Sequence, residues 1–198
     1  YIPVLYCNAV GANDSLVFDG RSFAMGEDAS IRGICGWAEE ALIYDSVSGK
    51  ANRMLFDPLL QKAEFIEENQ LPYLDRYEEI QNAIVVGIKD YLRKSGFSKV
   101  VLGLSGGIDS ALVAVLAAQA IGRQNVTCIA MPSRFSSEAS LDDAVELCRR
   151  NKLRLERIPI EVPFTAYLEA LSVPFAGKPY DTTEENLQAR IRGTLLMA

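Results

Sequence analysis

The sequence has 198 residues, 49% of them hydrophobic, which is enough for one large or two small hydrophobic cores. Its net charge of −6 argues against a nucleic-acid-binding surface, so an anionic substrate must be met by locally placed cations and backbone amides. No stretch approaches the ~20 apolar residues of a membrane span, and the first residues do not resemble a signal peptide. The absence of histidine excludes an imidazole base and a histidine metal ligand.

Four cysteines are scattered along the chain, at Cys7, Cys35, Cys128 and Cys148. They show neither the spacing of a metal site nor the density of a secreted disulfide framework, so we expect a reducing, cytoplasmic location. Cys7 has no base nearby in the sequence that would activate a thiol. We therefore expect it to be a packed strand residue and not a nucleophile.

Residues 1–47 are typical of a β-rich region, because apolar and polar residues alternate in short runs separated by turn residues. The predicted strands cover 1–10, 16–18, 22–25 and 31–35, with turns at 12–14 and 26–28. We interpret this region as the tail of a larger β-rich domain.

The segment 46–70 is polar and charged, and it predicts a connector with a short solvated helix over 61–69. A longer helix is predicted from Asp75, whose side chain can cap it while Glu78 closes a capping box. Apolar residues then recur at three- and four-residue steps until the helix ends near Gly96. We expect this apolar face to lie in the core; it consists of Tyr77, Ile80, Ile84, Ile88 and Tyr91.

The segment 100–121 combines a short apolar run, a glycine-rich turn and a helix rich in Ala, Leu and Val. A glycine turn at a helix N-terminus suits phosphate, because its N–H groups and the helix dipole favour an anion. Ser105 and Ser110 add hydroxyl donors, and Asp109 adds a carboxylate that suits a magnesium ion bridging to phosphates. The alternative is a Gly-Gly turn that only joins a strand to a helix. Neither a Walker loop nor a dinucleotide fingerprint fits the spacing.

Strand, loop and helix alternate again in the residues that follow. Strands are predicted over 125–131 and 154–160, and helices over 140–151, capped by Ser140, and from Pro163 to Leu171. This order predicts a doubly wound parallel α/β sheet with its ligand at the carboxyl ends of the strands. Arg134 follows the second strand and could meet a phosphate or a nucleotide sugar there; a solvated loop arginine is the alternative.

The last segment, 182–198, predicts a helix that opens with a capping box over 182–185. Its buried stripe consists of Leu187, Ile191 and Leu195. Asn186 and Arg190 lie four residues apart and hence on one face, with Gln188 and Arg192 beside them. By themselves these four residues describe an ordinary polar face.

Three segments carry a resemblance to known enzymes. The loop SGGIDSA, preceded by LGL, resembles the pyrophosphate loop of the N-type ATP pyrophosphatases, which adenylate a substrate. The runs MPSRFSSEASLDDA and TEENLQARIRGTLLMA are similar to segments of the NAD synthetases, particularly the glutamine-dependent kind. They occur in that family's order and spacing over about residues 76–198. This resemblance implies an α/β fold, a doubly wound parallel sheet of the adenine nucleotide alpha hydrolase-like, Rossmann-like type.

The run LYCNAVGANDSLVFDGRSF resembles the late strands of a nitrilase-type amidohydrolase domain. Together the resemblances imply three parts: the C-terminal remnant of a nitrilase-like αββα glutaminase domain (1–55), a linker (56–75) and an ATP-pyrophosphatase domain truncated at its C-terminus (76–198). The cysteine nucleophile, glutamate base and lysine of such amidases would then lie outside this sequence. We expect the fragment to be inactive alone.

The resemblance implies a ligase that forms a carbon–nitrogen bond, with ATP and Mg²⁺. The carboxylate of deamido-NAD attacks the α-phosphate of ATP to give an acyl-adenylate and pyrophosphate; ammonia from glutamine then displaces AMP and leaves NAD. A homo-oligomer is implied, with no nucleic-acid or membrane partner, and no catalytic residue is assigned. The family pattern gives ATP to Gly103, Leu104, Ser105, Gly106, Gly107, Ile108, Asp109, Ser110 and Arg134, magnesium to Asp109, and deamido-NAD to Asn186 and Arg190.

Two alternatives stay open. Another amidotransferase with a pyrophosphatase loop, of the GMP or asparagine synthetase type, shares SGGIDS but does not predict ENLQAR or a nitrilase-like partner domain. A module that binds a nucleotide without turnover is the second alternative.

Overall fold

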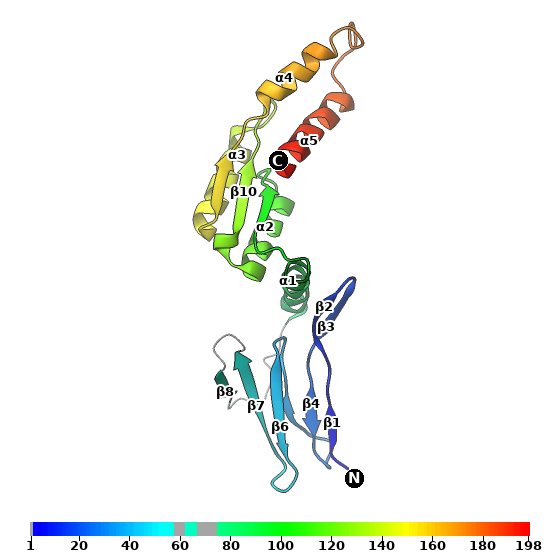
Figure 1. Ribbon diagram of the computed structural model, residues 1–198, viewed down its shortest axis with the longest axis vertical. Coiled ribbons are helices and arrows are strands. Elements are labelled where there is room, and N and C mark those ends of the chain that lie inside the picture. Colours follow the sequence, from blue (N-terminus) through cyan, green and yellow to red (C-terminus); the bar gives the residue numbers. More distant parts are fainter. Residues whose placement is uncertain (1, 58–61, 67–74) are drawn as a thin grey trace. The chain divides into compact units, whose positions relative to one another are not determined.

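The computed structural model describes residues 2–57, 62–66 and 75–198. By their internal contacts the residues form two compact units, Tyr1–Gly96 and Phe97–Ala198 (Figure 1). The first unit consists of antiparallel strands and one helix, and the second is a parallel α/β unit. None of the described helices is both long enough and apolar enough to cross a membrane.

Short antiparallel strands make up most of the first unit, which confirms its predicted β-rich character. One sheet has the order β1-β4-β5 and contains β1 (Val4–Tyr6), β4 (Phe23–Met25) and β5 (Ile31–Ile34). A separate hairpin contains β2 (Val10–Asn13) and β3 (Leu16–Asp19). A third group has the order β6-β7-β8 and contains β6 (Glu40–Asp45), β7 (Lys50–Asp57) and β8 (Lys62–Ile66).

The predicted single strand over 1–10 is wrong, because the chain leaves β1 after Tyr6 and starts β2 at Val10. Asn8 fixes this break: its backbone N–H donates to Ser22 Oγ at 2.9 Å, and its side chain donates to Asp19 at 3.0 Å. Cys7 lies in the break and is exposed, so the expectation of a packed strand residue is also wrong. The turn expected at 12–14 begins later, at Asp14, since 12 and 13 still belong to β2.

The connector predicted over 46–70 is wrong where the structure describes strands. β7 pairs with β6 along its length, from Lys50 opposite Asp45 to Leu55 opposite Glu40, and β8 pairs with β7. The polar sequence conceals an alternation in which Ala51 and Arg53 are buried. The Arg53 guanidinium can be buried because it pairs with the buried Glu40 carboxylate, with Nε 2.8 Å from Oε2. The helix expected over 61–69 is a strand at 62–66, and its other residues lie outside the described ranges.

The helix α1 (Arg76–Lys94) has the predicted start, with the Asp75 side chain accepting from the N–H groups of the first turn and Glu78 closing the capping box. Its predicted core face is mostly exposed, however, at Tyr77, Ile80, Ile84 and Tyr91. The helix buries Asp90 and Leu92 instead and packs against β2 and β3. Periodicity located the apolar face, but it could not show which face has a partner in this chain.

The second unit is built on a parallel sheet with the order β11-β10-β9. Its strands are β9 (Val100–Gly103), β10 (Val126–Ala130) and β11 (Arg154–Arg157). Its helices are α2 (Ile108–Ile121), α3 (Glu138–Asn151), α4 (Glu161–Ala170) and α5 (Thr182–Met197), and a short 3₁₀ helix, η1 (Arg123–Asn125), precedes β10. The elements match the predicted order, although β11 ends three residues earlier than expected.

Helices cover both faces of this sheet, as the doubly wound prediction requires. Alternate residues of β10 point to opposite faces. On one face Cys128 packs with residues of α2 and α3, and on the other Ile129 packs with Phe164 of α4 and Ile191 of α5. The carboxyl ends of β9 and β10 are therefore flanked by helices on both sides, where this class of fold places ligands.

Two predicted helix caps are displaced. Ser137, not Ser140, caps α3, because its side chain accepts from the Ser140 N–H at 3.1 Å. Asp181 caps α5, with Glu184 completing a capping box one residue earlier than predicted. In both cases an earlier polar residue is the cap, three residues before the expected one in α3 and one residue before it in α5.

Candidate active site

The loop between β9 and α2 is held close to the start of α3. Gly106 has a φ of +82°, and a Cβ atom at this position would overlap the backbone of Ser140. A left-handed φ and the missing side chain are both required here, so glycine is the residue that fits. Loop 104–107 and the first turn of α3 therefore form one surface at the carboxyl end of the sheet.

Two serines stabilise the loop from within. Ser110 Oγ accepts from the Ser105 N–H at 3.2 Å and donates to the Gly107 carbonyl at 3.0 Å. Ser105 Oγ accepts from the Gly107 N–H at 3.2 Å and lies 3.0 Å from Ser110 Oγ. This network orders the turn before any ligand is present, which lowers the cost of binding one.

The first turn of α2 presents an anion-binding end. The N–H groups of Ile108, Asp109 and Ser110 have no partner within the helix, because the first intrahelical bond is made by Ala111 to Gly107 at 3.1 Å. Their partial positive charge favours phosphate oxygens. The Asp109 side chain is exposed in the same turn, and among the described residues no cation pairs with it. Its magnesium role stays a prediction.

A pocket of about 240 Å³ lies beside this loop. One part is polar, with the hydroxyl-bearing residues Ser105, Ser136 and Ser140. The larger part is apolar and comes from β9, β10 and the helices on both faces: Gly103, Leu104, Ala130, Met131, Pro132, Leu141, Ala144 and Leu196. An apolar slot next to a loop whose N–H groups suit phosphate fits a nucleotide, whose base needs one environment and whose phosphates need the other.

Arg192 also lines this pocket. The sequence predicted Arg192 only as a neighbour of Asn186 and Arg190. It did not predict that Ser136 and Ser140 line a pocket. Sequence spacing could not find them, since Ser136 comes from the loop after β10, Ser140 from α3 and Arg192 from α5, and only the tertiary fold brings them together. The signals in the sequence that could have indicated these residues are the serines at 136, 137 and 140 and the four-residue step from Gln188 to Arg192.

Arg134 is bound by α4 and does not line the pocket. Its Nε donates to Glu161 Oε1 at 2.6 Å, its backbone N–H donates to Oε2 at 3.1 Å, and Nη2 donates to Thr165. These hydrogen bonds raise the pKa of Arg134 and lower that of Glu161. The predicted contact of Arg134 with a phosphate or sugar would have to compete with Glu161.

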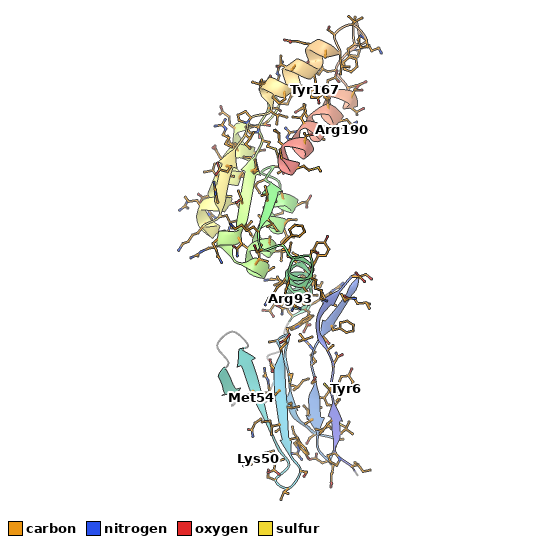
Figure 2. All side chains as sticks on the ribbon, in the orientation of Figure 1. Tyr6, Lys50, Met54, Arg93, Tyr167 and Arg190 are labelled. Carbon is orange, nitrogen blue, oxygen red and sulfur yellow. The ribbon has the colours of Figure 1, made fainter. Side chains whose placement is uncertain are left out.

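Asn186 and Arg190 lie together on the exposed face of α5, where Figure 2 labels Arg190. The Arg190 side chain donates to the Asn186 carbonyl at 3.1 Å. The neighbouring Gln188 is buried and accepts from Ser133 Oγ at 2.9 Å. A second pocket, of about 480 Å³, is lined by Gln188 together with residues of the α5 start and two aromatic residues: Phe135, Tyr180, Asp181, Thr182, Glu184 and Glu185.

The buried cysteines of this unit are structural. Cys128 and Cys148 both lie in the core, and burial raises the pKa of Cys128 to about 12 and also raises that of Cys148. Such thiols stay protonated at neutral pH and are poor nucleophiles. In the described parts of the chain, no group of three or more Cys, Asp or Glu side chains could hold a metal.

Comparison with known proteins decides the family. The family model described as NAD synthase matches residues 80–198, which is more than half of the chain. The chain belongs to the NAD synthase family. A curated relative, the glutamine-dependent NAD(+) synthetase of Rhodobacter capsulatus, is 46% identical over 199 residues, covering 100% of this chain and 34% of the relative.

Solved structures agree with this membership of the NAD synthase family. The glutamine-dependent NAD+ synthetase of Acinetobacter baumannii, in complex with adenosine diphosphate, is 36% identical with a TM-score of 0.78, covering 99% of this chain and 35% of that one. The NH3-dependent NAD synthetase of Campylobacter jejuni has a TM-score of 0.55 and 34% identity, covering 63% of this chain and 52% of that one. The chain thus spans about a third of the length of its glutamine-dependent relatives.

The family match begins inside α1, whereas the internal contacts place α1 with the strands of the first unit. β7 also runs through position 55, the predicted end of the first part. The division into 1–55, 56–75 and 76–198, and the nitrilase-like nature of the first part, stay predictions.

Proposed function

We propose that the protein carrying this sequence converts deamido-NAD to NAD, with ATP cleaved to AMP and pyrophosphate as the carboxylate is activated and with ammonia drawn from glutamine. The observation that supports this most is the joining of an apolar pocket to the Ser105–Ser110 loop at the carboxyl ends of β9 and β10. The glutamine-dependent NAD synthetases at up to 46% identity, and the relative that binds ADP, support the choice of substrates.

The adenine and ribose of ATP occupy the apolar pocket, and the β- and γ-phosphates lie in the loop 103–110. The N–H groups of Ile108, Asp109 and Ser110, which have no partner within the helix, then donate hydrogen bonds to the phosphate oxygens. Because these donors are fixed by the helix, they stabilise charge on the departing pyrophosphate without reorganising.

The donor set fits magnesium, since Mg²⁺ is usually held by one or two carboxylates together with waters and substrate phosphates. Asp109 offers one exposed carboxylate beside the phosphate-binding N–H groups, and it has no competing cation among the described residues. A magnesium ion there would neutralise phosphate charge and favour pyrophosphate as a leaving group.

The chemistry proceeds in two steps. A carboxylate oxygen of deamido-NAD attacks the α-phosphorus of ATP; the bond to the bridging oxygen breaks and pyrophosphate leaves with its electron pair. The product is an acyl-adenylate, in which a poor acyl donor has gained a good leaving group. Ammonia then attacks the acyl carbon, loses a proton, and AMP leaves. Asn186 and Arg190 are the residues that we assign to deamido-NAD.

Product analysis of the full-length protein tests this proposal. With ATP, Mg²⁺, deamido-NAD and either glutamine or ammonium, we expect NAD, AMP and pyrophosphate in equal amounts. A protein that binds ATP but releases no pyrophosphate when deamido-NAD is present would be a binding module. Pyrophosphate release that depends on xanthosine monophosphate or aspartate, and not on deamido-NAD, would indicate another amidotransferase.

A further inference from the structure

Arg192 is placed at the candidate nucleotide pocket by a backbone contact. Its Nε donates to the carbonyl oxygen of Met131 at 3.1 Å, which ties α5 to the carboxyl end of β10. This bond uses one of the five N–H donors of the guanidinium and holds the group at the pocket wall. Of the residues that line this pocket in the described chain, Arg192 alone carries a charge.

The guanidinium has no counter-ion within the described residues. Its nearest other contact is Gln188 Oε1, which is neutral and lies 3.5 Å from Nη2, at the weak limit of hydrogen bonding. Burial lowers the pKa of Arg192, and no carboxylate offsets that effect. An arginine nevertheless keeps its charge in proteins, so this partly buried cation has neutral hydrogen-bond acceptors but no counter-ion among the described residues.

The other arginines of the second unit are exposed, including Arg123, Arg157 and Arg190, for which the described residues provide no ion pair. Four of the exposed arginines are paired. Arg134 pairs with Glu161, Arg149 and Arg150 pair with Glu146, and Arg154 pairs with Glu156. Those side chains are all substantially exposed, where an unpaired charge would cost little. Arg192 is more buried and is unpaired, which is the arrangement expected of a group that waits for an anionic ligand.

The shape of the pocket indicates which anion this is. Its apolar part accepts a base, and Ser105 marks the side where the phosphate-binding loop begins. Arg192 lines the same space, whereas no residue of the first turn of α2 does. The N–H groups of that turn suit the outer phosphates. A planar guanidinium is suited to donate two parallel hydrogen bonds to two oxygens of one phosphate.

We propose that Arg192 binds the phosphate group next to the nucleoside, which is the group that is attacked in the adenylation step. This assignment rests on the proposed function. It gives Arg192 a binding role that differs from the roles assigned to Asp109, Arg134 and Arg190. The same hydrogen bonds would stabilise the negative charge that builds up on the α-phosphate while the carboxylate oxygen bonds to its phosphorus.

Equilibrium binding of adenosine and AMP to the full-length protein tests the assignment, since the two ligands differ by that phosphate alone. We expect wild-type protein to bind AMP about tenfold or more tightly than adenosine, as is typical for a charge-assisted contact. Arg192→Gln should abolish the preference and leave adenosine affinity within about twofold. Arg192→Lys should keep part of the preference for AMP, because the ammonium retains the positive charge but cannot donate two parallel hydrogen bonds as a guanidinium does.

Arg149→Gln is the matched control, because it removes the same charge from an exposed position on α3 that pairs with Glu146. It should bind both ligands as wild type does. If Arg192→Gln weakened adenosine and AMP equally, the role of Arg192 would be to hold Met131. If the AMP preference survived and only the KM for deamido-NAD rose, the anion would be the acceptor's carboxylate. Either result overturns the assignment.

The failure of the proposed function gives a different pattern. Wild-type protein that bound neither adenosine nor AMP would contradict the nucleotide pocket itself, and the Arg192 assignment would fall with it. Wild-type protein that bound both ligands equally well, and still made AMP and pyrophosphate from ATP, would overturn the Arg192 assignment alone.

Discussion

The carboxylate of Asp90 on α1 accepts a hydrogen bond from the backbone N–H of Ala12 on β2, with 2.8 Å between Oδ2 and N. The Lys94 ammonium donates to the carbonyl oxygen of the same Ala12, so one turn of the helix holds both polar groups of a single residue. Gly11 has a φ of +127°, and a Cβ there would press on the Asp90 carboxylate. This contact joins the β2–β3 hairpin to α1.

Replacing Asp90 with alanine should lower the free energy of unfolding of the first unit by about 1–3 kcal/mol, because the Ala12 N–H would lose its acceptor in a buried position. Urea unfolding followed by circular dichroism measures the change. Lys89→Ala on the exposed side of α1 is the control and should have little effect. An Asp90→Ala protein as stable as wild type would contradict the importance of this contact.

The contribution of Asp90 should also depend on pH. Burial by itself would raise the pKa of Asp90, but the Ala12 N–H, Arg93 and Lys94 together bring it below its usual value. A lowered pKa in the folded state means that the charged form stabilises the fold, so this stability is present above about pH 4 and is lost as the pH falls through the folded pKa. The difference between wild type and Asp90→Ala should therefore shrink in acid. A difference that grew below pH 4 would contradict the direction of this shift.

Gly106→Ala should impair nucleotide binding more than folding. The added methyl group would overlap the Ser140 backbone, and the left-handed φ would be strained by about 1–3 kcal/mol. We expect ATP affinity to fall sharply in a titration while the circular dichroism spectrum is retained. Gly193→Ala on α5, where an added Cβ meets nothing within 4 Å, should be neutral or slightly stabilising. Normal ATP affinity in Gly106→Ala would show that the loop can shift without loss.

The Glu40–Arg53 pair should be important for the first unit, because both side chains are buried. Glu40→Ala removes the buried carboxylate that pairs with this guanidinium and should cost about 3–5 kcal/mol of unfolding free energy. Replacing both residues with leucine and methionine should cost less than the single change. Glu146→Ala removes an exposed carboxylate and should change little. Equal losses for the single and double replacements would contradict this reasoning.

Asp109→Asn should keep the fold and lose magnesium-dependent adenylation by at least about a hundredfold, since the carboxylate is the group assigned to the metal. Pyrophosphate release over a range of magnesium concentrations is the measurement. If a higher magnesium concentration restored pyrophosphate release by Asp109→Asn, this would support the conclusion that the substitution weakens metal binding. Turnover equal to that of wild type would refute the metal role of Asp109.

The second unit could be predicted largely from the sequence because its signals are local. The apolar run at 100–104, the glycine turn and the capped helices are each set by neighbouring residues, and the family pattern places the loop at a strand end. The caps Ser137 and Asp181 were displaced by a few residues because several adjacent polar side chains can serve. Local chemistry fixes such features to within a turn.

The rest depends on long-range contacts that spacing does not encode. The sequence of β7 is polar at Arg53 and therefore predicted a connector, whereas Arg53 is buried in a pair with Glu40 on the neighbouring strand β6. The apolar stripe of α1 is periodic but exposed, since the helix is bound through Asp90 instead. Arg192 and Glu161 acquire their positions only when α5 and α4 pack on the sheet.

Oxygen-18 transfer tests the central claim most directly. Full-length protein is incubated with ATP, Mg²⁺, ammonium and deamido-NAD labelled with oxygen-18 in its carboxylate, and the AMP is analysed by mass spectrometry. Attack of the carboxylate on the α-phosphate predicts that AMP gains one labelled oxygen per turnover. Unlabelled AMP, formed together with NAD, would contradict the acyl-adenylate and the attack of the carboxylate on the α-phosphate.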